Sequence, residues 1–169
     1  MHYGGKPLDG TDGPYPSIID TGTSQLSIPP KVFESLHAEW QQAIPGGLDC
    51  KTDETFCLTQ KKCEEITPFI KPVGIQMSGQ IFELQPDQYL YQGDKHCYVI
   101  LAECKLTGKN RDIYIMGDAF LKHFYSAYDF DKNEVSLGIN THSKGKVKMT
   151  PAWTNYLRIF LSMGFWGFG

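Results

Sequence analysis

Short apolar segments interrupted by glycine, proline and aspartate dominate the sequence from Ile66 to Ile139. Segments of this length and punctuation are typical of β-strands joined by tight turns. The composition agrees, because 13% of the residues are aromatic and the chain holds 17 glycines and 10 prolines. A helical period is clear in residues 31–44, where apolar residues occupy Val32, Phe33, Leu36, Trp40 and Ile44. The sequence therefore predicts a mainly β fold with one or two short helices.

The length and charge of the chain limit its class. A chain of 169 residues with 41% hydrophobic and 21% charged residues is expected to fold as one soluble domain. A net charge of −3 over the whole chain favours no nucleic-acid partner. Residues 1–16 and 48–63 are polar or rich in turn residues, and we expect loops there.

Motifs for metal or cofactor chemistry are absent from the sequence. Neither GxxxxGK[ST] nor GxGxxG occurs, so phosphate or dinucleotide binding is not predicted. The histidines lack the HExxH spacing, no cysteine pair has the CxxC spacing, and GxSxG does not occur. We therefore expect neither a metal nor a cofactor.

The five cysteines indicate an oxidising compartment, where two disulfides and one leftover thiol are the simplest arrangement. They are Cys50, Cys57, Cys63, Cys97 and Cys104. The alternative is a cytosolic protein with buried free cysteines. The first residues are polar and show no secretory leader, so we expect the targeting segment of a secretory protein to lie outside this sequence.

The segment IIDTGTS, residues 18–24, places a carboxylate at the end of an apolar strand. Gly22 permits a tight reversal of the backbone and a close approach to a neighbouring group. The hydroxyls of Thr21, Thr23 and Ser24 are suited to hydrogen-bond the carboxylate or the backbone, which would hold Asp20 in one rotamer. The segment predicts a functional carboxylate, and an ordinary strand-end turn is the alternative.

A second segment, residues 113–139, helps to interpret the IIDTGTS segment. An apolar strand ends in Gly-Asp, a short helix follows, and an aromatic strand and a hairpin complete the segment. Together with DTGT and a Leu-x-x-Pro strand before a helix, this order resembles the C-terminal lobe of pepsin-like aspartic proteases over residues 14–140. The matching residues of the second segment are Ile115, Met116, Gly117, Asp118, Phe120, Tyr128, Asp129, Val135, Gly138 and Ile139.

The resemblance implies a single lobe of the pepsin-like acid-protease double-ψ β-barrel fold. In that fold the strand before Gly117 and the DTGT loop form a crossed ψ-loop around the catalytic aspartate. Thr21, Ile115, Met116 and Gly117 would belong to this structural motif. The family also has a disulfide around a Pro-x-x-Tyr segment. The expected disulfides are therefore Cys63–Cys97, on the family's pattern, and Cys50–Cys57, which leaves Cys104 free.

The resemblance also implies aspartic-type endopeptidase activity on peptide or protein substrates. In such enzymes two aspartates share a proton: the ionised one activates water, and the protonated one donates toward the scissile carbonyl oxygen. Neither a metal nor a covalent intermediate is needed. Asp20 would be one catalytic residue, and Gly22, Thr23 and Ser24 would contact the substrate.

The partner of Asp20 is the missing element, because the sequence holds one DTG motif and about half the length expected for two lobes. Asp118 and Asp129 match family positions that are structural. One interpretation is half of a two-lobed protease, inactive alone, whose N-terminal lobe lies elsewhere. The others are a single-lobe protease that pairs with a second copy, and a non-catalytic peptide-binding lobe. We favour the first.

The end of the sequence differs from the rest, so we divide the chain into a lobe, residues 1–140, and a tail, residues 141–169. Residues 152–169 are rich in Trp, Phe and Leu but fall short of the ~20 apolar residues that span a bilayer. They are interpreted as an interfacial membrane segment or as a segment packed on the lobe. The expected location is the secretory pathway, in a lysosome-like or vacuole-like compartment or outside the cell, with membrane contact through 152–169.

Overall fold

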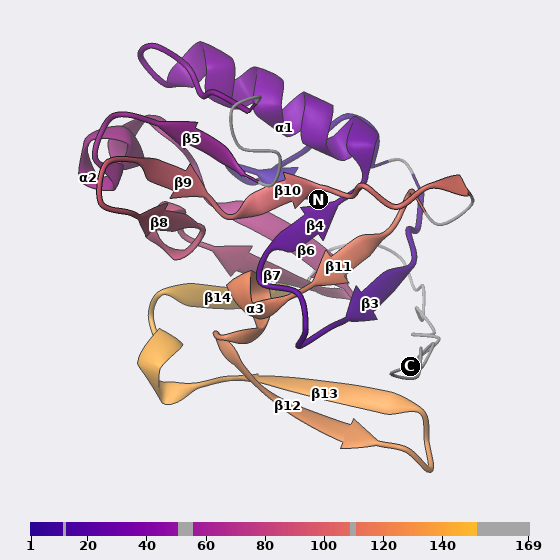
Figure 1. Ribbon diagram of the computed structural model, residues 1–169. Coiled ribbons are helices and arrows are strands. Elements are labelled where there is room, and N and C mark those ends of the chain that lie inside the picture. Colours follow the sequence, from indigo (N-terminus) through magenta and orange to yellow (C-terminus); the bar gives the residue numbers. More distant parts are fainter. Residues whose placement is uncertain (12, 51–55, 109–110, 152–169) are drawn as a thin grey trace.

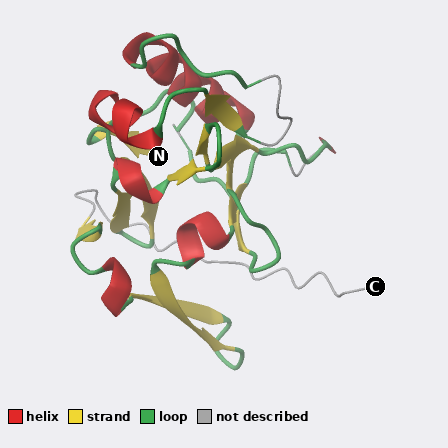
Figure 2. Ribbon diagram, turned by 60° about the vertical axis from the view of Figure 1, so that its left-hand side comes forward, coloured by secondary structure: helices red, strands yellow, loops and turns green. Residues whose placement is uncertain are grey.

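The computed structural model describes residues 1–11, 13–50, 56–108 and 111–151, and its strands form several sheets. Figure 1 shows helix α1 at one end of the molecule and the hairpin β12–β13 at the other. Figure 2, turned by 60°, shows the same separation. The fold is mainly β with few helices, as predicted. Within the described residues, no helix has the length and apolar character needed to cross a membrane.

The largest sheet has five antiparallel strands in the order β14-β7-β6-β1-β2. Its strands are β1 (His2–Tyr3), β2 (Lys6–Pro7), β6 (Val73–Met77), β7 (Gln80–Leu84) and β14 (Val147–Pro151). Strands β6 and β7 form a hairpin whose two turn residues, Ser78 and Gly79, have φ values of 47° and 74°. Two left-handed residues give a turn whose twist matches the strands. Strand β14 lies at an edge of this sheet.

A second sheet of four strands, in the order β10-β4-β11-β3, carries the IIDTGTS segment. Its strands are β3 (Ser17–Ile19), β4 (Leu26–Ile28), β10 (Leu101–Glu103) and β11 (Tyr114–Met116). Strand β11 lies between β3 and β4, parallel to β3 and antiparallel to β4. The loop that joins β3 to β4 therefore passes across the end of β11, which is the expected crossed arrangement.

A third sheet of three strands is tied to the body by two disulfides. Its order is β5-β9-β8, with β5 (Cys57–Thr59), β8 (Leu90–Gln92) and β9 (Cys97–Val99). Cys63, at the start of α2 (Cys63–Ile66), is bonded to Cys97, and Cys50 is bonded to Cys57. This is the expected pairing, and Cys104 is free and buried.

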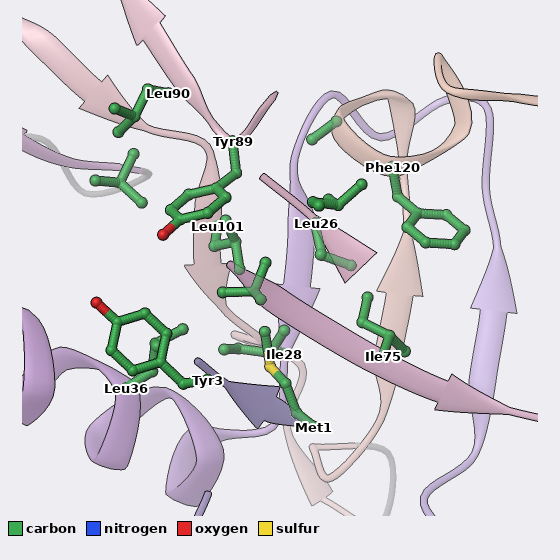
Figure 3. Close-up of a cluster of buried hydrophobic side chains, with 14 of the residues drawn as sticks. Met1, Tyr3, Leu26, Ile28, Leu36, Ile75, Tyr89, Leu90, Leu101 and Phe120 are labelled. Atoms are coloured by element: carbon green, nitrogen blue, oxygen red, sulfur yellow. The ribbon is translucent and has the colours of Figure 1, made fainter. Parts of the chain in front are cut away.

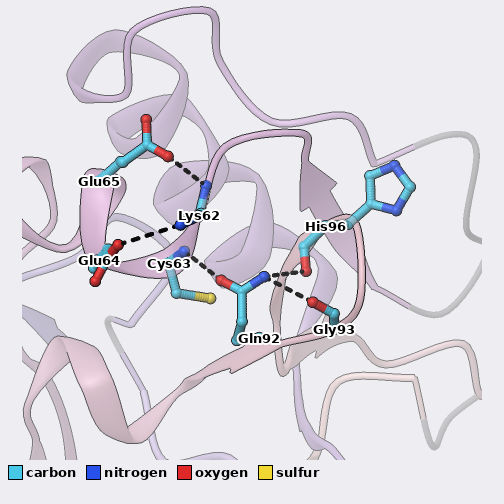
Figure 4. Close-up of polar contacts among 7 residues, drawn as sticks. All are labelled: Lys62, Cys63, Glu64, Glu65, Gln92, Gly93 and His96. Carbon is cyan, nitrogen blue, oxygen red and sulfur yellow. Dashed lines mark hydrogen bonds and ion pairs between the residues drawn. The ribbon is translucent and has the colours of Figure 1, made fainter.

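Polar contacts of Gln92 support the Cys63–Cys97 disulfide. Its side-chain oxygen accepts a hydrogen bond from the Cys63 backbone N–H at 2.8 Å (Figure 4). Its amide nitrogen donates to the backbone oxygens of Gly93 at 2.8 Å and His96 at 3.3 Å. One side chain thereby joins the start of α2 to the turn between β8 and β9.

Helix α1 (Pro30–Ala43) matches the predicted helical period closely. Proline at its first position needs no N–H partner, which suits it to a helix start. Val32, Leu36 and Trp40 form its buried face, and the ring of Trp40 stacks on Tyr89 with centroids 6.4 Å apart. Figure 3 shows the core that this face covers, with Leu26 and Ile28 of β4 beside Leu101 of β10. Each fully buried aliphatic side chain contributes about 1.5–3 kcal/mol to folding.

The hairpin formed by β12 (Phe124–Asp129) and β13 (Glu134–Ile139) is a separate two-stranded sheet. It follows the short helix α3 (Asp118–Leu121). The Asp129 carboxylate accepts hydrogen bonds from the backbone N–H groups of Asp131 and Lys132 and from the Lys132 ammonium group. These bonds, led by that of the Lys132 side chain, lower the pKa of Asp129.

Two predicted loop regions contain short strands, so those two predictions were wrong in part. Strands β1 and β2 lie within residues 1–16, and β5 lies within residues 48–63. Each has two or three residues, and β1 and β5 pair with strands far away in sequence, β6 and β9. Local composition does not indicate such strands, because their stability comes from the distant partner. The predicted boundary at residue 140 stays a prediction; beyond it, β14 pairs with β7.

Candidate active site

Asp20 follows the edge strand β3 directly, and its backbone is fixed by the neighbouring strand β11. Its backbone N–H donates to the carbonyl oxygen of Met116 at 3.1 Å, which continues the β3–β11 pairing by one residue. Met116 is fully buried, so this anchor is rigid. The Asp20 side chain is half-buried at the point where the strand ends.

Both carboxylate oxygens of Asp20 accept hydrogen bonds from the turn that follows it. The backbone N–H of Gly22 donates to Oδ1 at 2.9 Å. The hydroxyl of Thr23 donates to Oδ2 at 2.6 Å, within the usual range of hydroxyl hydrogen bonds. The carboxylate is therefore held in one rotamer by its own loop. Thr23 supplies one of the three hydroxyls expected there, whereas the donor of Gly22 is its backbone N–H.

Gly22 is needed for space and not for a left-handed backbone. A Cβ built on Gly22 would lie 3.2 Å from Oδ1 of Asp20, closer than most such contacts. Its φ lies outside the left-handed region, which shows that the turn itself does not demand glycine there. The predicted close approach to a neighbouring group is present, and that group is the Asp20 carboxylate.

Gly117 is where the crossed strands come into closest contact. A Cβ on Gly117 would collide with the backbone oxygens of Thr23 and Gln25. The next two residues bond to the same loop: the N–H of Asp118 donates to the Thr23 oxygen at 2.8 Å, and the N–H of Ala119 donates to the Ser24 oxygen at 2.9 Å. The residues that join β11 to α3 thus hold the backbone of the Asp20 loop, residues 20–25, in place.

The remaining predicted residues divide between the surface and the core. Thr21, Gly22 and Ser24 are exposed, so the outer side of the Asp20 loop is open. Ile115 is half-buried, paired with Ile18 on one side and with Ser27 on the other. Ile115, Met116 and Gly117 of the structural motif are therefore packed, whereas its fourth residue, Thr21, is exposed. Of the predicted substrate contacts, Gly22 and Ser24 are exposed and Thr23 is half-buried.

The two acids that match structural family positions, Asp118 and Asp129, form no hydrogen bond with Asp20 in the described part of the chain. Asp129 caps the hairpin turn, and the Asp118 side chain is exposed at the start of α3. In the described part of the chain, no group of three histidine, cysteine or acidic residues is arranged to hold a metal ion. The site as described therefore offers a single oriented carboxylate on an open surface.

Sequence reasoning missed two backbone contributions to this site. The carbonyl oxygen of Gln25 lies against Gly117, and the carbonyl oxygen of Ser24 accepts a hydrogen bond from the N–H of Ala119. Backbone atoms leave no signature in residue type, so the only signal was the glycine at position 117. A glycine that follows an apolar strand indicates a close approach of another backbone.

Comparison with known proteins places this arrangement in a family. The family model described as eukaryotic aspartyl protease matches residues 5–139. Gastricsin of Rattus norvegicus is 31% identical over 121 residues, which cover 71% of this chain and 28% of that protein. Gastricsin of Cavia porcellus is 33% identical over 119 residues, 70% of this chain and 28% of that protein.

A fungal relative covers more of the chain. The probable aspartic-type endopeptidase CTSD of Arthroderma otae is 30% identical over 147 residues, which cover 84% of this chain and 34% of that protein. The chain thus spans about a third of the length of the curated relatives it matches. Because the family model extends over most of the sequence, the chain belongs to the eukaryotic aspartyl protease family.

Proposed function

We propose that this chain supplies one half of an aspartic endopeptidase, with Asp20 as one of its two catalytic carboxylates. The observation that carries the proposal is the hydrogen bonding of Asp20, whose oxygens are held by the Gly22 N–H and the Thr23 hydroxyl on a loop supported by β11. The two bonds hold the carboxylate in one orientation at an open surface, within the residues that the aspartyl protease family model matches.

The chemistry requires a second carboxylate facing Asp20. Two carboxyl groups held close together share one proton, because both cannot be ionised at once. The ionised group takes a proton from water, the water oxygen attacks the peptide carbonyl carbon, and the protonated group donates to the carbonyl oxygen. The hydrogen bonds from Gly22 and Thr23 fix the orientation of the Asp20 carboxylate before a substrate binds.

The second carboxylate is proposed to come from another lobe of the same protein. The chain spans about a third of its relatives, which leaves room for a lobe beyond it. Two exposed features near the ends of the fold suit such a neighbour: β3 is an edge strand, and the β12–β13 hairpin exposes Tyr125 and Phe130. A hairpin with little buried surface is marginally stable alone and gains from a covering partner.

The hydrogen bond between Thr23 and Asp20 limits which hydroxyl of the loop is able to bond a substrate. The Thr23 hydroxyl already donates to Asp20, so its proton is not free for a peptide. The Ser24 side chain is exposed beside it and is proposed to be the hydroxyl that bonds the peptide main chain. Gly22, also exposed, would allow the substrate to approach the carboxylate closely.

The test uses the longest polypeptide that the gene encodes in frame with residues 1–169. We expect an upstream DTG motif, cleavage of an unfolded protein in mild acid, and inhibition by a statine-type mimic of the tetrahedral intermediate. Asp20→Asn should reduce cleavage about a thousandfold or more. Asp118→Asn, at an exposed carboxylate nearby, is the matched control and should retain most of the activity.

Other outcomes would favour the other interpretations. Cleavage by a chain that sediments as a dimer, with no upstream DTG motif, would replace the missing lobe by a second copy. Binding of the statine-type mimic without cleavage would favour a peptide-binding lobe. Undiminished cleavage by Asp20→Asn would refute the catalytic role itself.

A further inference from the structure

Two buried polar side chains meet where the β12–β13 hairpin joins the rest of the fold. His123, between α3 and β12, is 3% exposed, and Ser143, the last residue of the 3₁₀ helix Thr141–Ser143, is 5% exposed. The Nδ1 atom of His123 lies 2.9 Å from the Ser143 hydroxyl oxygen, so the two side chains share a hydrogen bond. The proposed catalysis uses neither residue. A buried polar pair of this kind fixes the two segments that contribute to it.

The backbone around His123 ties the base of the hairpin to α3. The N–H of His123 donates to the carbonyl oxygen of Phe120, in α3, at 3.2 Å. The carbonyl oxygen of His123 accepts from the backbone N–H of Asn140 at 3.0 Å, and the Asn140 side chain donates to the Lys122 carbonyl oxygen at 2.6 Å. Asn140 directly follows β13. His123 is therefore the point at which α3, both ends of the hairpin and the segment leading to β14 are joined.

Helix α3 connects this junction to the Asp20 loop. Figure 1 shows α3 between the sheet that carries β3 and β11 and the β12–β13 hairpin. At the start of α3, the N–H groups of Asp118 and Ala119 donate to the carbonyl oxygens of Thr23 and Ser24. A helix of four residues is not stable without such outside contacts. Loss of the contacts that His123 makes would therefore remove support from the Asp20 loop.

The surroundings of His123 suit a neutral imidazole and oppose a protonated one. Its second ring nitrogen, Nε2, is buried and has no hydrogen-bond partner in the part of the chain that the structure describes. A protonated ring would carry a positive charge and an N–H donor at that position. Burial makes both costly, because neither water nor an acceptor compensates them.

The charged groups around His123 come from three segments. Lys122 precedes it and Lys146 follows the 3₁₀ helix, and both disfavour a second positive charge. Asp87 and the backbone of Gln88, which follow β7, favour the proton, but neither forms a hydrogen bond with Nε2. Burial is the largest effect, and together with the lysines it lowers the pKa of His123 from 6.5 to about 4.

We propose that His123 and Ser143 form an acid-sensitive anchor, which holds α3 and the hairpin in place while the imidazole is neutral and releases them in acid. In the released form the ring reaches water, where a histidine takes up a proton at about pH 6.5. Falling pH therefore shifts the population toward the released form. The effect on the Asp20 loop follows from the contacts of α3, whereas any effect on catalysis rests in addition on the proposed function.

The experiment is hydrogen exchange of backbone amides in the full chain, corrected for the intrinsic exchange rate at each pH. Ala119 and Asn140 report on the anchor, because their N–H groups bond to the Asp20 loop and to His123. Between pH 7 and pH 5, above the range in which most carboxylates titrate, their protection factors should fall about twentyfold.

Low concentrations of urea separate local release from global unfolding. Release of the anchor exposes little surface, so the protection of Ala119 and Asn140 should be insensitive to urea. The N–H groups of Leu26 and Ile100 are bonded within the core, and their protection should fall with urea because global unfolding exposes them.

Three variants identify the groups responsible. In His123→Gln, which does not titrate, the protection of Ala119 and Asn140 should change less than about threefold between pH 7 and pH 5. His142→Gln, at an exposed histidine next to Ser143, is the matched control and should keep the change of about twentyfold. Ser143→Ala removes the partner of Nδ1 and should lower the protection of both amides about fivefold at pH 7. An NMR titration of the His123 ring in the unmodified chain needs no variant and should show protonation at about pH 4.

Four results would overturn the proposal. The first is a protection of Ala119 and Asn140 that does not change with pH in the unmodified chain. The second is an undiminished change in His123→Gln. The third is equal urea dependence of these amides and of the core amides, since release would then occur only by global unfolding. The fourth is a His123 ring that takes up its proton at about pH 6.5, as in water. None of these readouts depends on cleavage, so the anchor and the proposed catalysis fail independently.

Discussion

The Asp20 loop and the β12–β13 hairpin differ in how much of the chain surrounds them. The loop lies on crossed strands whose backbones touch, and Gly117 has no space for a side-chain atom. The hairpin is paired only with itself in the described structure, and Gly138 within it has nothing within 4 Å of where a Cβ would lie. The inner side of the Asp20 loop is thus packed against its own chain, whereas the hairpin has space for a neighbour.

The largest expected effect compares glycines in these two regions. Gly117→Ala forces a Cβ into the backbone oxygens of Thr23 and Gln25, so we expect a loss of about 3 kcal/mol or more in the free energy of unfolding. Gly138→Ala should change it by less than about 0.5 kcal/mol. Urea unfolding of both variants makes the comparison, and equal stability would show that the crossed strands relax easily.

A second prediction concerns the base of the hairpin, where His123 is 3% exposed. Its Nδ1 lies 2.9 Å from the Ser143 hydroxyl. Burial, assisted by the neighbouring Lys122, lowers the pKa of His123 from 6.5 to about 4. The folded state thus binds the proton less tightly than the unfolded state, so stability is fully present above pH 6.5 and declines as the pH falls toward 4.

The loss over this window is at most about 3 kcal/mol. His123→Gln should flatten the dependence of unfolding free energy on pH between 6.5 and 4. The exposed His142 serves as the control, because its replacement by glutamine should leave the slope unchanged. A steep slope that persists in His123→Gln would assign the acid sensitivity to other groups.

A smaller effect is expected at the carboxylate itself. Thr23→Val keeps the shape of the side chain but removes the 2.6 Å hydrogen bond to Asp20, which should cost about 1 kcal/mol of stability. Thr23→Ser retains the hydroxyl and should lie close to the unmodified chain. Thermal unfolding measures both, and equal losses would mean that the methyl group of Thr23 matters more than its hydroxyl.

The smallest effect on the isolated chain is expected on the hairpin surface. Tyr125 is 72% exposed and Phe130 is 64% exposed, so serine at either position should change stability by less than about 0.5 kcal/mol. In the longer polypeptide the same variants should destabilise the fold markedly, because a covering lobe would bury these rings. Similar small effects in both forms would contradict a partner on this face.

The sequence was most informative where local pattern and local structure coincide. The period of residues 31–44 predicted α1 within about one residue, and the apolar run before Gly117 predicted β11. The DTGTS residues predicted a hydroxyl bond to the Asp20 carboxylate, which Thr23 makes, because donor and acceptor are three residues apart. The bond from the Gly22 backbone N–H was not predicted. The short strands β1 and β5 escaped prediction because they pair with β6 and β9, which lie far away in the sequence, and β2 pairs only with β1 among the described strands.

By itself the sequence determined the mainly β class, the one long helix and the family, since these rest on residue types and their spacing. Only the tertiary structure decided that β11 runs between β3 and β4, and that Gly117 lies against Thr23 and Gln25. It also decided that β14 lies at the edge of the largest sheet. The physical reason is range: propensity acts over a few residues, whereas the pairing of β3 with β11 joins segments about a hundred residues apart.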